Sequence, residues 1–205
     1  MELLDYFDGK RTLDRYHIKS AESRYVASKD EATEFASGGA IVLKLISSKA
    51  LHKSKAGLVK LGLKGNQISR AYSELLIKGA SLKPYKIIAQ KMSEPGIEII
   101  LGGKTDEQFG KMILIGLGGI YVEAFRDFAI RSVPITKYDA ISMIDQLRSR
   151  DVITHQGRNR KMIENLLMSM SSLLHDNESI TEVDLNPIVV HDGSYEAVDI
   201  RILKK

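Results

Sequence analysis

The chain has 205 residues, of which 43% are hydrophobic and 27% are charged, a balance that is typical of a globular protein. It contains no cysteine, which excludes disulfides, zinc–thiolate sites and a cysteine nucleophile. The net charge of +4 comes from lysines spread along the chain and only 6% of residues are aromatic, so the sequence does not favour nucleic-acid binding.

No apolar run approaches the length of a membrane span, and the N-terminus, Met1–Asp5, is acidic and short in apolar length. We therefore expect no signal peptide, no membrane association and a cytoplasmic location. The five histidines have no spacing that is typical of zinc ligands.

The first elements follow from capping residues and apolar runs. The pattern predicts a helix over 1–14 with a turn at Asp8-Gly9, a strand over 24–27, a helix from Ser28 to Gly38-Gly39, and a central strand over 40–46. This central strand carries one lysine, Lys44, which must find a partner because an isolated buried charge is costly. Lys44 either reaches water past the strand end or reaches a nucleotide phosphate, and the sequence leaves both interpretations open.

A basic loop of small residues, 47–57, follows this strand and precedes a second strand over 58–63. Its lysines and backbone N–H groups are suited to closing over phosphates. A solvated hairpin loop is the alternative.

The pattern in the middle of the chain predicts one helix and several strands and turns. These are a helix over 66–78, a strand over 85–92, a turn over 93–96, a strand over 97–101 that carries Glu98, a long turn over 102–110, and a strand over 111–115. The glycine cluster Gly116–Gly119 that follows lacks the spacing of a Rossmann fingerprint and the Lys-Ser/Thr of a P-loop. It indicates a turn between strands.

Strands over 120–123 and 131–135 come next, and Thr136 with Asp139 forms a capping box that opens a helix to about Arg150. A loop over 151–159 and an amphipathic helix over 160–175 complete this part of the chain.

The chain closes on a predicted hairpin, with strand 188–190, a turn around Asp192-Gly193 and a return strand over 195–202. A hairpin allows Asn186 and Asp199 to face the same spot, and Asp184 lies two residues before Asn186 and therefore on the same side. Amide and carboxylate oxygens suit magnesium that also holds phosphate oxygens. An ordinary hairpin with solvated Asp and Asn is the alternative.

Five segments together resemble one family, the ATP-grasp β subunit of ADP-forming acetyl-CoA (acyl-CoA) synthetase, which is related to the succinyl-CoA synthetase β subunit. The segments, which occur in consistent order from about Tyr16 to Arg201, are 51–54 (Leu-His-Lys-Ser), 109–110 (Phe-Gly), 115–123 (Ile-Gly-Leu-Gly-Gly-Ile-Tyr-Val-Glu), 131–135 (Arg-Ser-Val-Pro-Ile) and 182–187 (Glu-Val-Asp-Leu-Asn-Pro).

The resemblance implies an α/β (α+β) ATP-grasp fold with the nucleotide between two lobes, which we expect over residues 1–92 and 93–205, with the first helix able to pack on the second lobe. The implied reaction is acyl-CoA + ADP + phosphate ⇌ acid + CoA + ATP, through an acyl phosphate and a phosphohistidine. The phosphohistidine and the CoA site belong to a partner α subunit in an α2β2 heterotetramer, and this chain binds ADP or ATP with Mg²⁺.

The resemblance also implies roles for individual residues. Nucleotide contacts fall on Lys44, Ser54 and Gly57 at the phosphates, on Gln90, Lys91 and Met92 along the adenine, and on Glu98 at the hinge. Asn186 and Asp199 hold magnesium, and Asp184 hydrogen-bonds the phosphohistidine ring. Arg131 stabilises the transferred phosphoryl group, and His52 takes part in transfer, with loop ordering as the alternative role of this histidine.

The sequence departs from the family pattern in the phosphate loop, where Lys55-Ala56-Gly57 replaces an aspartate and paired glycines. The family's Arg-Gly before the last helices has its nearest match, in reversed order, at Gly157-Arg158. A nucleotide-binding homologue without catalytic activity, or a succinyl-CoA synthetase-type β subunit, are therefore alternative functions.

Overall fold

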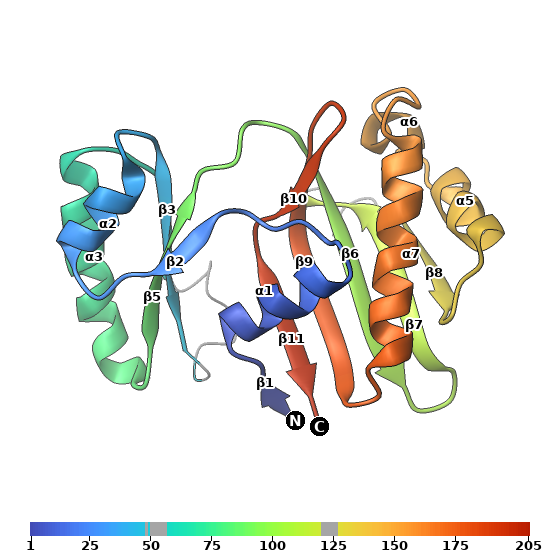
Figure 1. Cartoon of the computed structure of the whole chain (residues 1–205), viewed down its shortest axis with the longest axis horizontal. Helices are drawn as coiled ribbons and strands as arrows, with labels where there is room; N and C mark the ends of the chain where they lie inside the picture. Colours follow the sequence, from blue (N-terminus) through green and yellow to red (C-terminus); the bar gives the residue numbers. More distant parts are fainter. Residues whose placement is uncertain (48, 50–56, 120–126) are drawn as a thin grey trace. The chain divides into compact units, whose positions relative to one another are not determined.

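The computed structural model describes residues 1–47, 49, 57–119 and 127–205. Contacts divide them into two compact units (Figure 1): a smaller unit of residues 21–93, and a larger unit that joins residues 1–20 to residues 94–205.

The smaller unit is an antiparallel sheet with helices on one face (Figure 1). Its strands, in spatial order, are β2 (Ser23–Tyr25), β5 (Lys86–Lys91), β3 (Ile41–Ile46) and β4 (Val59–Leu63), and its helices are α2 (Lys29–Ala36), α3 (Asn66–Gly79) and the 3-10 turn η1 (Ala80–Leu82). Alternate residues of β3 and β5 pack under α2 and α3, and they include Leu43, Leu45 and Ala89. The expected N-cap of α2 is confirmed, since Ser28 accepts a hydrogen bond from the Glu31 N–H at 3.1 Å.

The larger unit is built on a second antiparallel sheet. Its strands, in spatial order among the described residues, are β1 (Glu2–Leu3), β11 (Ile200–Lys204), β9 (Ile180–Val190), β6 (Ile97–Asp106), β7 (Gly110–Leu117) and β8 (Phe128–Ser132), with β10 (Tyr195–Ala197) also paired to β9. Its helices are α1 (Tyr6–Arg15), α5 (Lys137–Gln146), α6 (Arg150–Ile153) and α7 (Arg160–Asp176).

The helices α1, α5 and α7 cover one face of this sheet (Figure 1). Gly103 of β6 lies against Leu174 of α7, and Gly9 of α1 lies against Ile200 and Ile202 of β11. We call the opposite face of the larger sheet the open face, because no described helix covers it. This division decides which side chains can form a site.

Most elements agree with the sequence expectations, and the capping box of Thr136 and Asp139 is confirmed. The expected turn at Asp8-Gly9 is wrong, because α1 runs through it: the missing side chain of Gly9 lets α1 lie close on β11. The expected long turn over 102–110 is also wrong, since β6 and β7 pair down to Asp106 and Gly110. Two further elements differ: α6 begins at Arg150 and occupies the start of the expected loop 151–159, and the return strand is interrupted between β10 and β11.

The expected strand over 120–123 lies outside the described residues. The first twenty residues belong with residues 94–205 by contact, because β1 pairs with β11 and α1 packs on the same strand. The expected boundary between two nucleotide-binding lobes, after residue 92, stays a prediction. No helix among the described residues is long and apolar enough to span a membrane.

We expect Gly103→Ala to lower the free energy of unfolding by roughly 1–3 kcal/mol, because a side chain there overpacks the sheet against α7. The new Cβ would lie 2.7 Å from Leu174 Cδ2. Gly102→Ala is the matched control, since the nearest atom to its Cβ is the Val183 carbonyl oxygen at 3.5 Å. Urea unfolding of both variants is the measurement, and equal midpoints would contradict the prediction.

Candidate functional site

The open face of the larger sheet carries the polar residues of the closing hairpin. Asp184 of β9 pairs in register with Gly102 of β6 on one side and with Arg201 of β11 on the other. Directly paired residues of antiparallel strands share a face. The neighbouring Val183 is 1% exposed and pairs with Gly103, which faces α7, so Asp184 points to the open face.

The two expected metal ligands lie opposite each other beside Asp184. Ile200 pairs with Leu185, and continuing this antiparallel register by one residue places Asp199 across from Asn186. A backbone hydrogen bond of 3.1 Å from the Val198 N–H to the Pro187 carbonyl holds the strands together there. Asp184 alternates with buried Leu185, and Asn186, which follows Leu185 at an irregularity in the pairing with β6, is exposed.

This donor set fits magnesium that is completed by phosphate oxygens. Within the described ranges, no three His, Asp or Glu side chains gather closely enough to hold a metal ion. Asn186 and Asp199 contribute one amide oxygen and one carboxylate. Magnesium commonly takes one or two protein oxygens together with water and substrate phosphates.

Glu98 lies at the start of β6 and is held by the glycine cluster. The Gly118 N–H donates to the Glu98 carbonyl at 2.7 Å, and a Cβ on Gly118 would lie 2.9 Å from that oxygen. Gly119 has a left-handed φ of +72°, and its Cβ would lie 2.9 Å from Glu98 Oε2. The sequence indicated only a turn here. In the structure, these glycines also lie in close contact with Glu98.

Arg131 lies on the other face of the sheet. It pairs with Ile113, which pairs in turn with Gly103, and so it belongs to the row that faces the helices. Its guanidinium donates to Ser142 Oγ of α5 at 3.0 Å and to the Ile130 carbonyl at 2.8 Å.

The strands β7 and β6 separate β8 from β9, so the structure does not bring Arg131 together with Asp184. Arg131 instead contributes to packing around α5.

Hydrogen bonds from Thr136, with a smaller contribution from the charge of Arg131, hold the pKa of the Asp139 carboxyl below its usual value.

Lys44 and Gln90 lie on the face of the smaller sheet that is opposite α2 and α3. Lys44 pairs with Ile88 and Gln90 pairs with Val42, whereas the alternate residues Leu43 and Ala89 pack under the helices. Lys44 is 4% exposed and Gln90 is 1% exposed. The expectation that Lys44 sits buried in an inner strand is confirmed.

The side chain of Lys91 points to the helix-covered face of the smaller sheet. Its Nζ donates to the carbonyls of Phe35 at 2.6 Å and Ala36 at 3.3 Å, and it lies 4.8 Å from the centre of the Phe35 ring. A cation at these carbonyls stabilises the C-terminus of α2. Lys91 therefore ties α2 to the end of β5, and the next residue, Met92, is 42% exposed.

Gly57 ends the expected phosphate loop with a left-handed φ of +65°. The Lys78 ammonium of α3 donates to its carbonyl at 3.3 Å, and any side chain at Gly57 would overlap that ammonium. The left-handed φ favours glycine at this position, whereas the exposed lysine side chain could move aside. His52 and Ser54 lie outside the described residues.

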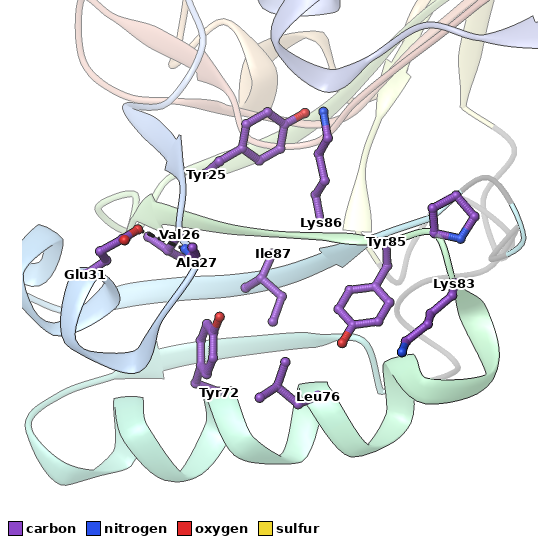
Figure 2. A pocket seen from close by; sticks show the side chains of 11 residues that line it. Tyr25, Val26, Ala27, Glu31, Tyr72, Leu76, Lys83, Tyr85, Lys86 and Ile87 are labelled. Atoms are coloured by element: carbon purple, nitrogen blue, oxygen red, sulfur yellow. Dashed lines mark hydrogen bonds between the residues drawn. The ribbon is translucent and has the colours of Figure 1, made fainter.

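An open pocket of about 850 Å³ lies in the smaller unit (Figure 2). Tyr72, Leu76 and Ile87 lie on one side of β5, and Tyr25 and Lys86 lie on the other, with Lys86 Nζ 4.5 Å from the centre of the Tyr25 ring. Burial, with the nearby Glu31 charge, raises the pKa of the Tyr72 hydroxyl. None of the residues predicted to form the site lines this pocket.

Comparison with known proteins places this geometry in a family. The profile of the ATP-grasp domain family matches residues 1–203. The chain belongs to the ATP-grasp domain family. The resemblance and the fold that the sequence indicated are thereby confirmed.

Two curated relatives of this ATP-grasp chain are archaeal. Acetate–CoA ligase [ADP-forming] I of Archaeoglobus fulgidus is 34% identical, and the match covers 96% of this chain and 30% of that protein. Acetate–CoA ligase [ADP-forming] I subunit beta of Pyrococcus furiosus is 31% identical, and the match covers 96% of this chain and 89% of that subunit. The ATP-grasp chain thus spans about a third of the first relative and most of the second.

Two solved structures are also similar to this chain. Acetyl-coenzyme A synthetase 1 of Candidatus Korarchaeum cryptofilum, in complex with coenzyme A and Ca-AMPCP, is similar with a TM-score of 0.90 and 31% identity, over 100% of this chain and 94% of that one. A second structure of the same enzyme contains coenzyme A and Mg-AMPPCP, with its phosphohistidine segment pointing towards the nucleotide binding site. It matches with a TM-score of 0.82 and 30% identity, over 99% of this chain and 93% of that one.

The sequence-based interpretation missed the charged residues that flank Asp184 on the open face, of which Arg201 is paired with it directly. Arg201 follows Asp199 by two residues and pairs directly with Asp184. The period-two alternation of a strand would have found it.

We expect Lys91→Met to lower the melting temperature of this ATP-grasp chain, because it removes charged hydrogen bonds to Phe35 and Ala36, a type worth about 1.5–3 kcal/mol each. Amide hydrogen exchange should show the loss at the C-terminal turn of α2. Lys29→Met, an exposed lysine at the other end of the same helix, is the matched control. Unchanged exchange in α2 of Lys91→Met would contradict the anchoring role.

Proposed function

We propose that this chain is the nucleotide-binding β subunit of an ADP-forming acetyl-CoA or acyl-CoA synthetase. The observation that carries the proposal is that Asp184 points to the open face next to the place where the Val198 N–H to Pro187 carbonyl hydrogen bond brings the segments of Asn186 and Asp199 together. The ATP-grasp family match and the likeness to the Pyrococcus furiosus subunit support the reaction class. The reaction converts acyl-CoA, ADP and phosphate into acid, CoA and ATP.

Each group of residues has a role in phosphoryl transfer, a chemistry that depends on positioning and charge rather than on a nucleophile from this chain. Asp184 accepts a hydrogen bond from the ring of the partner's phosphohistidine and keeps it in the reactive tautomer. Lys44 contacts the nucleotide phosphates, and Gln90 and Met92 lie along the adenine. Glu98, held by its glycines, lies beside the nucleotide.

Asn186 and Asp199 are the residues that would hold magnesium. When bound, magnesium lessens the repulsion between a phosphorylated imidazole and ADP. The roles of His52, Ser54, Gly57 and Arg131 stay predictions from the sequence, and Lys91 contributes through its backbone while its side chain anchors α2.

A partner α subunit supplies the phosphohistidine and the CoA site. Two Pyrococcus furiosus relatives are named as beta subunits, which supports the expectation of a partner subunit. The α2β2 stoichiometry, the placement of the nucleotide between two lobes and a cytoplasmic location stay predictions. Production of ATP from ADP and a phosphorylated α subunit distinguishes this function from that of a nucleotide-binding homologue without catalytic activity.

We expect Asp199→Ala to weaken magnesium-dependent ADP binding roughly tenfold or more, because a carboxylate ligand of the metal is lost. Isothermal titration calorimetry with and without magnesium measures the effect. Asp192→Ala is the matched control: it is a carboxylate of the same hairpin whose side chain is 62% exposed and paired only on the surface with Arg158.

Equal ADP affinity of the two variants would remove Asp199 from the metal site. Absence of ADP binding by the unaltered chain would argue against the proposed nucleotide site as a whole.

A further inference from the structure

The open face around Asp184 is rich in negative charge. Glu182, Asp184 and Asp199 belong to this face by strand register and alternation. Glu98, near the start of β6, also belongs to it, because it alternates with the buried Ile99. A transferred phosphoryl group is itself negatively charged, so this face needs cations where that group arrives. Magnesium at Asn186 and Asp199 would supply one of them.

Arg201 is the arginine that strand register sets beside Asp184. Cross-strand partners have Cβ atoms about 4.5–5.5 Å apart, so Arg201 begins within reach of any group that Asp184 contacts. Asp199 lies two residues before Arg201, immediately before β11 begins. Lys104 is the cross-strand partner of Glu182, and this pair lies further from Asn186 than the pair of Gly102 and Asp184 does.

Glu182 holds the guanidinium of Arg201 in place. Arg201 Nη1 donates to Glu182 Oε1 at 3.2 Å, and the Arg201 side chain is 38% exposed. Arginine has five N–H donors in a rigid fork, so an ion pair through one nitrogen leaves donors for the oxygens of a phosphate. The side chain is therefore oriented by a neighbour and still accessible to a ligand.

Arg131, the arginine that the sequence assigned to the phosphoryl group, has neither property. It belongs to the helix-facing row and donates to Ser142 of α5. The two arginines are therefore separated by face as well as by strand.

We propose that Arg201, positioned by Glu182, binds the phosphoryl group that passes between the partner's phosphohistidine and ADP. This role rests on the proposed function. In the transfer, the N–P bond of the phosphohistidine breaks and its electron pair stays on the imidazole nitrogen, while a terminal β-phosphate oxygen of ADP forms the new bond to phosphorus. Arg201 donates to the equatorial oxygens of the transferred group, and Asp184 holds the ring N–H of the leaving imidazole.

The test compares two nucleotides that differ by the transferred group. In calorimetry with magnesium, Arg201→Gln should weaken binding of AMPPCP, which carries the terminal phosphoryl group, about tenfold. Binding of ADP should change less than twofold, because ADP lacks that group. Arg201→Lys keeps the charge and loses the fork, so we expect an intermediate loss for AMPPCP.

Three further variants give the comparison. Glu182→Gln should weaken AMPPCP selectively but less than Arg201→Gln, since it only releases the guanidinium. Arg148→Gln, an exposed arginine near the α5–α6 junction, should change neither affinity. Melting temperatures should stay close to that of the unaltered chain, because a half-exposed ion pair contributes about 1 kcal/mol or less.

The outcomes separate the two proposals. Equal effects of Arg201→Gln on AMPPCP and ADP, or no effect on either, would overturn the role of Arg201 while magnesium-dependent ADP binding leaves the nucleotide site standing. A selective loss of AMPPCP binding in Arg131→Gln, with Arg201→Gln unaffected, would return the role to Arg131. No magnesium-dependent binding of either nucleotide by the unaltered chain would overturn the site itself and this role with it.

Discussion

The register of β9 between β6 and β11 is the constraint on which the larger unit depends. Side chains of a strand alternate between faces, and directly paired residues share one face. This register puts Val183, Leu185 and Ile202 under the helices as core, and it puts Asp184 and Arg201 on the open face. A slip of one residue would exchange the two sets, burying carboxylates and exposing the core. Stability and the candidate site are thus fixed by the same pairing.

Glycines maintain the close packing that this arrangement needs. Gly9 and Gly103 let α1 and α7 lie close to the sheet, which leaves the open face as the side for polar groups. Gly118 and Gly119 lie against Glu98, where a side chain would displace its carbonyl or its carboxylate. The glycine cluster therefore helps to position Glu98 although it contributes no charge.

Lysine and arginine side chains in this chain divide between those that bond helices and those that lie on sheet faces without a helix. Lys91 bonds the carbonyls at the end of α2, and Arg131 bonds Ser142 of α5. Lys44 and Arg201 lie on the sheet faces that helices leave uncovered. Residue type and neighbouring sequence do not separate these classes, because the face on which a side chain emerges depends on where its strand begins to pair.

The sequence by itself determined most of the element types, the caps at Ser28 and Thr136 and the family, because all of these follow from local patterns. Only the tertiary structure decided that α1 runs through Gly9, that β6 and β7 form one long hairpin, and that Lys91 and Arg131 face helices. It also set Arg201 beside Asp184. These features depend on contacts between segments far apart in the chain, and periodicity within one segment carries no information about which partner covers each face.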